Sequence, residues 1–148
     1  LFAGRLEIFP GIPELLTSLH HDGMPMMVTT NTDRDVADAA IAVIGSEYFV
    51  DTICGDEVPT GKPAPDMYLE AARRLQLNPA QCLVFEDSPA GMRAAVAAGC
   101  TVIGLPEDEG VEVPDGVVEI SRLRDSRHLA GALHTDVYEW FRAIQEMN

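Results

Sequence analysis

Apolar residues follow two alternating periods along the chain. Positions three and four residues apart predict amphipathic helices, and short continuous apolar runs predict buried strands. Helices are predicted at 12–19, 36–44, 68–75, 89–98 and 137–144, and strands at 26–30, 49–54, 82–85 and 101–105, with a further edge strand at 117–120. Because strands and helices alternate with short connections, we predict an α/β fold with a mostly parallel sheet covered on both faces.

Length and composition indicate one domain. The chain has 148 residues, and 47% of them are hydrophobic, which is enough to fill a core. No apolar run approaches the roughly 20 residues that span a bilayer, and residues 1–10 lack the basic start of a signal peptide. The three cysteines are too few for a disulfide framework and are expected to be reduced thiols. We therefore expect a cytoplasmic protein.

The net charge of −14 restricts the partners. Nucleic-acid phosphates and anionic membranes would be repelled, so neither is expected to bind. An anionic substrate would need its own local positive site. Core packing explains Trp140 in the last predicted helix better than an interface does, and we expect a monomer or a weak homodimer.

Two adjacent carboxylates, Glu86 and Asp87, directly follow the apolar run at 82–85. The C-terminal ends of buried parallel strands open into the ligand crevice of α/β proteins. Two acids side by side repel each other, and a hard cation such as Mg²⁺ offsets this repulsion, because it prefers oxygen ligands. The pair predicts a magnesium site at this strand end.

Polar residues also follow the two preceding predicted strands. Hydroxyls and loop amides of Thr29, Thr30 and Asn31 suit a phosphate oxygen, although this loop could equally serve to cap the next helix through Thr32 or Asp33. The next strand is followed by Lys62, whose proline neighbour restricts it to an extended backbone and would aim its ammonium at a fixed point. A hydroxyl, an ammonium and two carboxylates at successive strand ends are expected to converge on one crevice.

The chain resembles the haloacid dehalogenase (HAD) superfamily, and more closely its sugar-phosphate phosphatases and β-phosphoglucomutases. The segments that carry the resemblance are Phe9–Leu16, where the family re-enters its core from a helical cap, Met27–Asn31, Gly61–Asp66, and Phe85–Gly91 with Ala97–Gly99. The resemblance implies a three-layer Rossmann-like core at residues 11–148. It also implies that residues 1–10 are the tail of the cap, or a linker.

The resemblance also implies residue roles. Thr30, favoured over Thr29, would be the phosphate-binding hydroxyl beside Asn31, and Lys62 would neutralise the phosphate and the nucleophile. Asp87 would bind Mg²⁺ directly, and Glu86 would bind it directly or through water. Thr30 and Lys62 are the catalytic candidates within the chain.

The sequence departs from the family pattern because one expected motif is missing. HAD phosphotransferases need an Asp-x-Asp-x-Thr motif whose first Asp is the nucleophile, and the sequence contains none. The Asp33-Arg34-Asp35 segment has two acids at the right separation, but it opens a helix, and we interpret it as capping and surface charge. The fold is therefore expected to lack its first, central strand and its cap, and the nucleophile is expected to lie outside this chain.

The function implied by the resemblance is a Mg²⁺-dependent phosphatase acting on a small phosphorylated metabolite, a sugar phosphate, through an aspartyl-phosphate. A phosphomutase of the same family and a catalytically inactive HAD-like binding module are the alternatives. Without the nucleophile, the chain by itself is expected to be inactive. Since two apolar strands would lack a central neighbour, it is also expected to fold poorly by itself.

Overall fold

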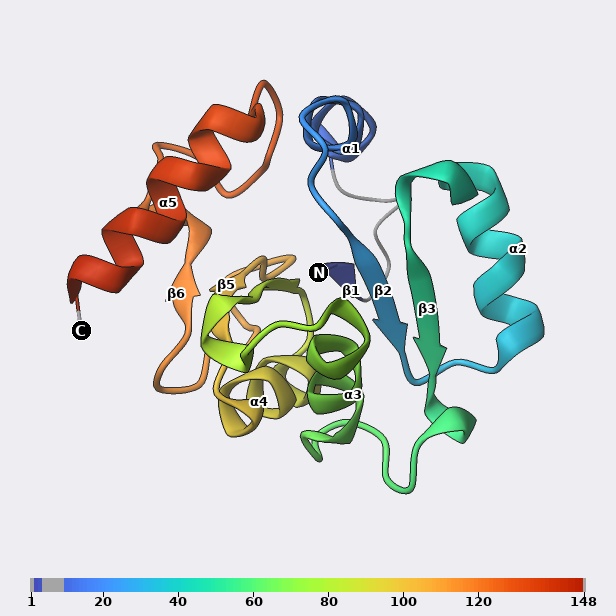
Figure 1. Cartoon of the computed structure of the whole chain (residues 1–148). Helices are drawn as coiled ribbons and strands as arrows, with labels where there is room; N and C mark the ends of the chain where they lie inside the picture. Colours follow the sequence, from blue (N-terminus) through green and yellow to red (C-terminus); the bar gives the residue numbers. More distant parts are fainter. Residues whose placement is uncertain (1, 4–9, 148) are drawn as a thin grey trace.

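The structure is a computed structural model, and it describes residues 2–3 and 10–147. Within these residues, parallel strands form one sheet in the order β3-β2-β1-β4-β5-β6 (Figure 1). The strands are β1 (Phe2–Ala3), β2 (Met27–Thr30), β3 (Asp51–Cys54), β4 (Leu83–Glu86), β5 (Thr101–Gly104) and β6 (Val118–Glu119). The helices are α1 (Ile12–His21), α2 (Arg34–Ile44), α3 (Asp66–Leu75), α4 (Pro89–Ala98) and α5 (His134–Met147).

Helices cover both faces of the sheet, as the sequence predicts. Helices α1 and α5 lie on one face, α3 and α4 lie on the other, and α2 lies beside the edge strand β3 (Figure 1). Adjacent strand residues point to opposite faces, so each strand supplies both cores. Val28, Phe85 and Ile103 pack in the cluster that contains α1 and α5, whereas Met27, Val84 and Val102 belong to the clusters that contain α3 and α4.

The helices and strands predicted at residues 12–144 are present, and their boundaries differ from the prediction by up to three residues. The strand expected from residue 49 begins at Asp51, because Ser46–Tyr48 form a 3-10 turn after Gly45 ends α2. The short apolar segment at 117–120 contains β6, which pairs with β5 through Val118 and Ile103. The predicted parallel α/β sheet with an edge strand at this end is confirmed.

The centre of the sheet differs from the expectation. The sequence predicted that no strand of this chain would lie between β2 and β4, but β1 lies there and pairs with both of them. Without β1, the facing edges of β2 and β4 would be unpaired. Backbone groups in a core need hydrogen-bond partners, which explains why β1 lies there. The cap-tail or linker predicted at 1–10 therefore includes a strand at Phe2–Ala3; residues 1 and 4–9 of that prediction lie outside the described residues.

Strand β1 fills only part of the central position. It pairs with Val28 and Thr29 of β2 and with Phe85 of β4. Nearer the N-terminal ends of β2 and β4 lies a cavity of about 280 Å³, whose lining includes Met26, Leu83 and apolar side chains of α1, α3 and α5. Helices from both faces line this cavity, so it lies at the level of the sheet, between the two strands.

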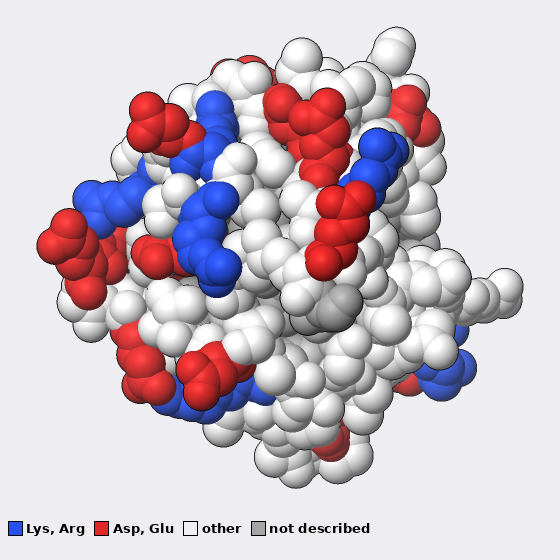
Figure 2. Space-filling view, turned by 90° about the vertical axis from the view of Figure 1, so that its left-hand side faces the viewer, with Lys and Arg blue, Asp and Glu red and all other residues white. Residues whose placement is uncertain are grey.

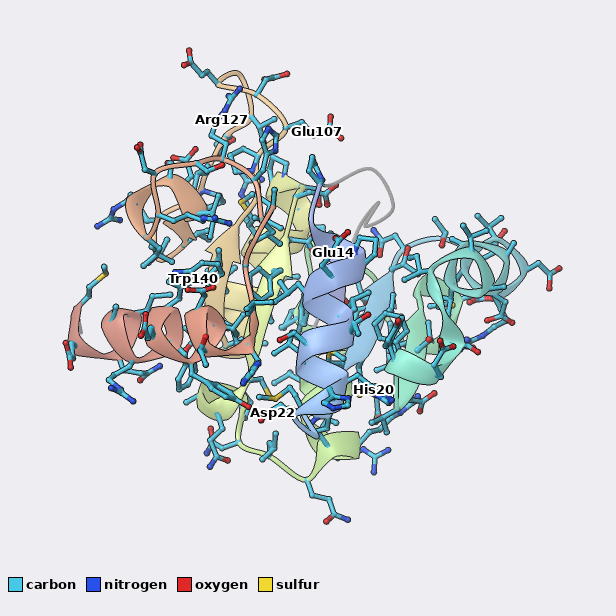
Figure 3. The ribbon with its side chains drawn as sticks, turned by 90° about the horizontal axis from the view of Figure 1, so that it is seen from above. Glu14, His20, Asp22, Glu107, Arg127 and Trp140 are labelled. Carbon is cyan, nitrogen blue, oxygen red and sulfur yellow. The ribbon has the colours of Figure 1, made fainter. Side chains whose placement is uncertain are left out.

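A polar contact fixes α5 beside α1. His134 is the first residue of α5. Its Nδ1 shares a hydrogen bond of 2.8 Å with Ser18 Oγ, and its backbone N–H donates to the same oxygen. Tyr138 of α5 donates to Asp22, just after α1. Seen from above, Asp22 lies at the end of α1 next to α5, and Trp140 lies farther along α5 (Figure 3). The buried Trp140 side chain serves core packing, as expected.

The surface carries both signs of charge. On the face that Figure 2 shows, the described Lys and Arg side chains are interspersed with Asp and Glu side chains. None of the described helices combines the length and the hydrophobicity that a bilayer-spanning segment requires. Cys54, Cys82 and Cys100 are free thiols, as the sequence predicted.

Candidate functional site

The residues singled out in the sequence line one cleft at the C-terminal ends of β2 and β4. Its volume is about 580 Å³, and its lining includes Thr30, Asn31, Lys62, Glu86 and Asp87. Apolar side chains of α2 line the cleft as well. The convergence predicted from successive strand ends is therefore present, although the role of each residue stays a prediction.

Lys62 and Glu86 form a buried ion pair at the floor of this cleft. The Lys62 ammonium lies 2.9 Å from Glu86 Oε2, and the two side chains are 5% and 0% exposed. The same ammonium donates to the backbone oxygen of Thr29 at 3.1 Å. Each buried charge needs the other as its partner, so the pair holds both side chains in a fixed direction.

The second carboxylate oxygen of Glu86 faces the start of α4. Backbone N–H groups of Asp87 and Ser88 donate to Oε1 at 3.2 and 3.4 Å, and the Ser88 hydroxyl lies 3.3 Å away. Ser88 is also the N-cap of α4, where its hydroxyl accepts from Gly91 N. Both Glu86 oxygens thus accept hydrogen bonds within the protein. We therefore expect Glu86 to contact a metal ion through a bridging water or to position the neighbouring residues that bind it.

Gly91 allows this approach of Glu86 to the helix. A Cβ at position 91 would lie 2.0 Å from the carboxyl carbon of Glu86. A side chain there would push the carboxylate away from the backbone amides and from Lys62. The glycine in the sequence motif therefore has a physical reason within this structure.

Tyr68 was missed as a site residue, because its helical spacing indicated only a core position. Its hydroxyl donates to Glu86 Oε2 at 2.6 Å, and its side chain is fully buried. The Lys62 ammonium also lies 5.3 Å from the centre of the Tyr68 ring. A signal was present in the sequence: a phenol on the buried face of a helix that begins just after Lys62 has a hydroxyl that needs a partner.

The pKa values of Glu86 and Tyr68 are shifted in opposite directions. Burial acts to raise the pKa of Glu86, but the charge of Lys62 and the hydrogen bond from Tyr68 outweigh it and lower the pKa overall. Burial and the Glu86 charge raise the pKa of Tyr68 well above its usual value. At neutral pH, Glu86 is therefore an anion and Tyr68 a protonated donor.

Asn31 holds the loop that carries Lys62. Its side-chain amide donates to the Lys62 backbone oxygen at 3.2 Å, and its Oδ1 accepts from the Lys62 N–H at 3.0 Å. A Cβ on Gly61 would lie 2.6 Å from that Oδ1, so the neighbouring glycine makes room for the contact. The Asn31 side chain is thus engaged with Lys62, and a phosphate contact from this residue would come from its main chain.

The two candidate threonines occupy different environments. Thr29 is fully buried, whereas Thr30 is half-buried and lines the cleft, and the role of Thr30 in phosphate binding stays a prediction. The Thr30 hydroxyl lies 3.0 Å from the Thr32 hydroxyl and accepts from Thr32 N–H. Asp33 occupies the N-cap of α2 without a capping bond from its side chain, so the predicted cap at Asp33 is present in position only.

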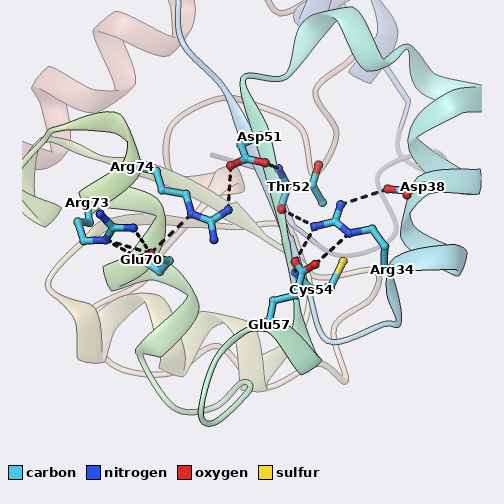
Figure 4. Close-up of polar contacts among 9 residues, drawn as sticks. All are labelled: Arg34, Asp38, Asp51, Thr52, Cys54, Glu57, Glu70, Arg73 and Arg74. Atoms are coloured by element: carbon cyan, nitrogen blue, oxygen red, sulfur yellow. Dashed lines mark hydrogen bonds and ion pairs between the residues drawn. The ribbon is translucent and has the colours of Figure 1, made fainter.

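A charged network fixes the strand that leads to the Lys62 loop (Figure 4). Arg34 contacts Glu57 with two nitrogens, at 3.0 and 2.5 Å, and donates to the backbone oxygen of Thr52 at 2.8 Å. Glu57 in turn accepts from Cys54 N–H at 2.8 Å. The hydrogen bonds from Arg34 lower the pKa of Glu57, although burial opposes them. Arg34 thus joins α2 to the end of β3.

The protein oxygens suited to a hard cation come from Asp87 and, less directly, from Glu86. The described residues contain no group of three or more His, Cys, Asp or Glu side chains placed to hold a metal ion. Mg²⁺ commonly uses one or two carboxylates and completes its shell with water and substrate phosphate. Asp87, which lines the cleft beside Lys62, fits one position of such a shell.

Comparison with known proteins identifies the family. A model of the haloacid dehalogenase-like hydrolases matches residues 1–99, and the chain belongs to this family. The chain is 41% identical over 110 residues to protein CbbY of Rhodobacter capsulatus, covering 72% of this chain and 48% of that protein. It is 38% identical over 100 residues to hexitol phosphatase A of Escherichia coli, covering 68% and 46%. The chain therefore spans about half the length of these curated relatives.

Solved structures agree with this family. CbbY from Rhodobacter sphaeroides, in complex with phosphate, superposes with a TM-score of 0.74 at 28% identity, covering 88% of this chain and 58% of that one. A putative β-phosphoglucomutase from Thermotoga maritima gives a TM-score of 0.66 at 28% identity, covering 74% and 55%. The predicted HAD-like core and its likeness to the phosphatase and β-phosphoglucomutase subgroup are confirmed.

Proposed function

We propose that the protein containing this chain is a Mg²⁺-dependent phosphatase that hydrolyses a small phosphorylated metabolite, a sugar phosphate. The observation that carries the proposal is the buried Lys62 ammonium, held 2.9 Å from Glu86 at a cleft that Thr30 and Asp87 also line. A fixed cation next to a hydroxyl and a carboxylate suits a phosphoryl group and a metal ion. Positioning and charge neutralisation supply most of the catalysis in phosphoryl transfer.

Lys62 and Thr30 would bind the phosphoryl oxygens. An ammonium has three N–H donors, and Lys62 directs two of them at Glu86 and the Thr29 carbonyl. The remaining donor is available to a phosphoryl oxygen in the cleft. The Thr30 hydroxyl can turn from Thr32 toward the same ligand, because it is a rotatable donor and acceptor.

Asp87 would hold the metal ion, assisted by Glu86 through water. When bound, Mg²⁺ would offset the negative charge of the phosphate and of an attacking carboxylate. The attacking carboxylate itself is proposed to come from an aspartate outside residues 1–148. Its oxygen would bond to phosphorus as the bond to the sugar oxygen breaks, and water would then hydrolyse the acyl-phosphate.

Support for a sugar phosphate comes from the relatives. Hexitol phosphatase A is a phosphatase by name, and the CbbY structure from Rhodobacter sphaeroides holds phosphate. The similarity to a putative β-phosphoglucomutase favours phosphoryl transfer within a sugar as the second candidate function. The two differ in whether inorganic phosphate is the product.

The test is phosphate release by the full-length protein, expressed from its whole reading frame. A panel of hexitol, hexose, pentose and triose phosphates is supplied with Mg²⁺ or with a chelator. We expect release from at least one member, abolished by the chelator and restored by Mg²⁺. Isomerised sugar phosphate without release would favour the mutase. No release and no isomerisation would overturn both and favour an inactive binding module.

A further inference from the structure

We propose that Tyr68 is a positioning residue for phosphoryl transfer, which holds Glu86 and, through it, Lys62 at the cleft. The inference rests on the proposed function of the same site. It assigns a task to a side chain that does not line the cleft and would not touch the substrate.

Tyr68 contacts both members of the buried pair with different parts of one side chain. Its hydroxyl donates to Glu86 Oε2 at 2.6 Å, which is the oxygen that Lys62 approaches to 2.9 Å. Its ring lies 5.3 Å from the Lys62 ammonium, within the range of a cation–π contact. The phenol thus fixes the carboxylate while the ring faces the cation.

The carboxylate is held from two sides. Oε2 accepts from Tyr68 and Lys62, and Oε1 accepts from the backbone N–H of Asp87. A carboxylate with donors at both oxygens cannot rotate freely about its terminal torsion. Its direction then determines the direction of the Lys62 ammonium.

The position of Tyr68 is itself rigid. Its side chain is 0% exposed and packs with Val84 and Met92 in the core beneath the cleft. Helix α3 also begins at Asp66, a few residues after Lys62. The helix therefore couples the packing of the core to the placement of the cation.

The exchange Tyr68→Phe removes one hydroxyl and keeps the ring. Without the phenol, Oε2 loses a donor, and the carboxylate can turn and draw the Lys62 ammonium with it. Because the ammonium matters most when charge accumulates on the phosphoryl oxygens, the loss should appear in kcat more than in KM.

The matched control is Tyr138→Phe. Tyr138 also donates its hydroxyl to a carboxylate, that of Asp22, but at the contact between α1 and α5, away from the cleft. In the full-length protein we expect Tyr68→Phe to lower kcat about tenfold, with KM changed less than threefold, on a sugar phosphate that the wild type hydrolyses. Tyr138→Phe should leave both constants unchanged.

Binding of inorganic phosphate, measured by calorimetry, separates this inference from the proposed function. A wild type that hydrolyses nothing, but binds phosphate at least threefold more tightly than Tyr68→Phe does, would refute the phosphatase and support the positioning. Unchanged kcat and phosphate affinity in Tyr68→Phe, with only a lowered melting temperature, would overturn the positioning.

If Tyr68→Phe does not fold, the wild type provides the measurement. The buried Tyr68 hydroxyl proton should be observable by NMR, because it is shielded from exchange with water. We expect its resonance to shift when inorganic phosphate is added, since the ligand would bind Lys62 and alter the shared carboxylate. A resonance that does not move at saturating phosphate would overturn the proposal.

Discussion

The Lys62 ammonium lies 2.9 Å from Glu86 Oε2, and both side chains are almost completely shielded from solvent. Lys62 lies in the loop before α3, and Glu86 is the last residue of β4. Their pairing fixes a cation beside a strand end, where a phosphoryl group can reach it. The proposed function depends on this pair more than on any other contact.

Removal of Lys62 should affect stability and activity separately. We expect Lys62→Met to abolish hydrolysis by the full-length protein and to lower the free energy of unfolding by about 3–5 kcal/mol, because Glu86 is left buried and unpaired. The double variant Lys62→Met/Glu86→Gln should regain much of the stability but no activity. Urea denaturation and phosphate release measure the two effects.

An exposed ion pair provides the control for Lys62. Arg93 and Glu112 form a contact on the surface, and both side chains are largely exposed. Arg93→Met should change the free energy of unfolding by less than about 1 kcal/mol and leave hydrolysis intact. A loss in Arg93→Met as large as that in Lys62→Met would contradict the importance of the buried pair.

Asp87→Asn tests the metal assignment. The amide keeps the shape of the side chain but removes the charge that a hard cation prefers, so we expect Mg²⁺-dependent turnover to vanish. Calorimetric titration with Mg²⁺ should show weaker binding by at least tenfold. Glu109→Gln removes an equal charge from an exposed side chain and should change neither quantity. Wild-type affinity in Asp87→Asn would refute the assignment.

Gly91→Ala should damage the site through Glu86. The added Cβ would lie 2.0 Å from the Glu86 carboxyl carbon, so the carboxylate must move. We expect a loss of about 1–3 kcal/mol in the free energy of unfolding, typical of overpacking, together with reduced hydrolysis. Gly110→Ala, in an exposed loop, is the control and should unfold as the wild type does. Normal stability and kinetics in the Gly91→Ala variant would contradict the close approach.

The Arg34–Glu57 contact predicts a pH dependence of stability. The pKa of Glu57 is lowered from 4.5 in the folded state, mainly by the hydrogen bonds from Arg34. A depressed carboxyl pKa stabilises the fold above the unfolded pKa, and this contribution disappears as the pH falls through the folded pKa. The stability difference between wild type and Glu57→Gln should therefore be constant near neutral pH and shrink below about pH 4.5. A difference that does not change between pH 7 and pH 3 would rule out this linkage.

The 148-residue chain expressed by itself is expected to unfold without a sharp transition. Strand β1 contributes two residues between β2 and β4, and an apolar cavity of about 280 Å³ lies near their N-terminal ends. Unpaired strand edges and unfilled apolar space both destabilise a core. Thermal unfolding followed by circular dichroism measures this directly. A steep cooperative transition for the isolated chain would show that β1 suffices.

Much of the fold follows from the sequence, because apolar periodicity reports directly on buried faces. The predicted strand ends also placed Lys62, Glu86 and Asp87 at one cleft, and the structure shows all three lining it. The position of β1 could not be foreseen, since two residues carry no period and their pairing depends on strands distant in the sequence. Tyr68 was interpreted as core for a related reason: periodicity reports that a side chain is buried but not which group its hydroxyl meets.

Asn31 shows another limit of the sequence. The sequence left open whether the loop after β2 holds phosphate or serves the local structure; the Asn31 side chain bonds the backbone of Lys62, and its phosphate role stays a prediction. Local sequence cannot separate a ligand contact from a contact between loops, because both need the same donors and acceptors. The distinction depends on where the loop after β3 lies.

Locating the phosphorylated residue tests the proposed mechanism at its decisive step. The full-length protein is mixed with a hydrolysed sugar phosphate and quenched within one turnover, and the acyl-phosphate is reduced with borohydride and mapped by mass spectrometry. The proposed mechanism predicts one modified aspartate outside residues 1–148, and this modification should be lost when Lys62 is replaced by Met. Hydrolysis without any acyl-phosphate, or a modified aspartate within residues 1–148, would contradict it.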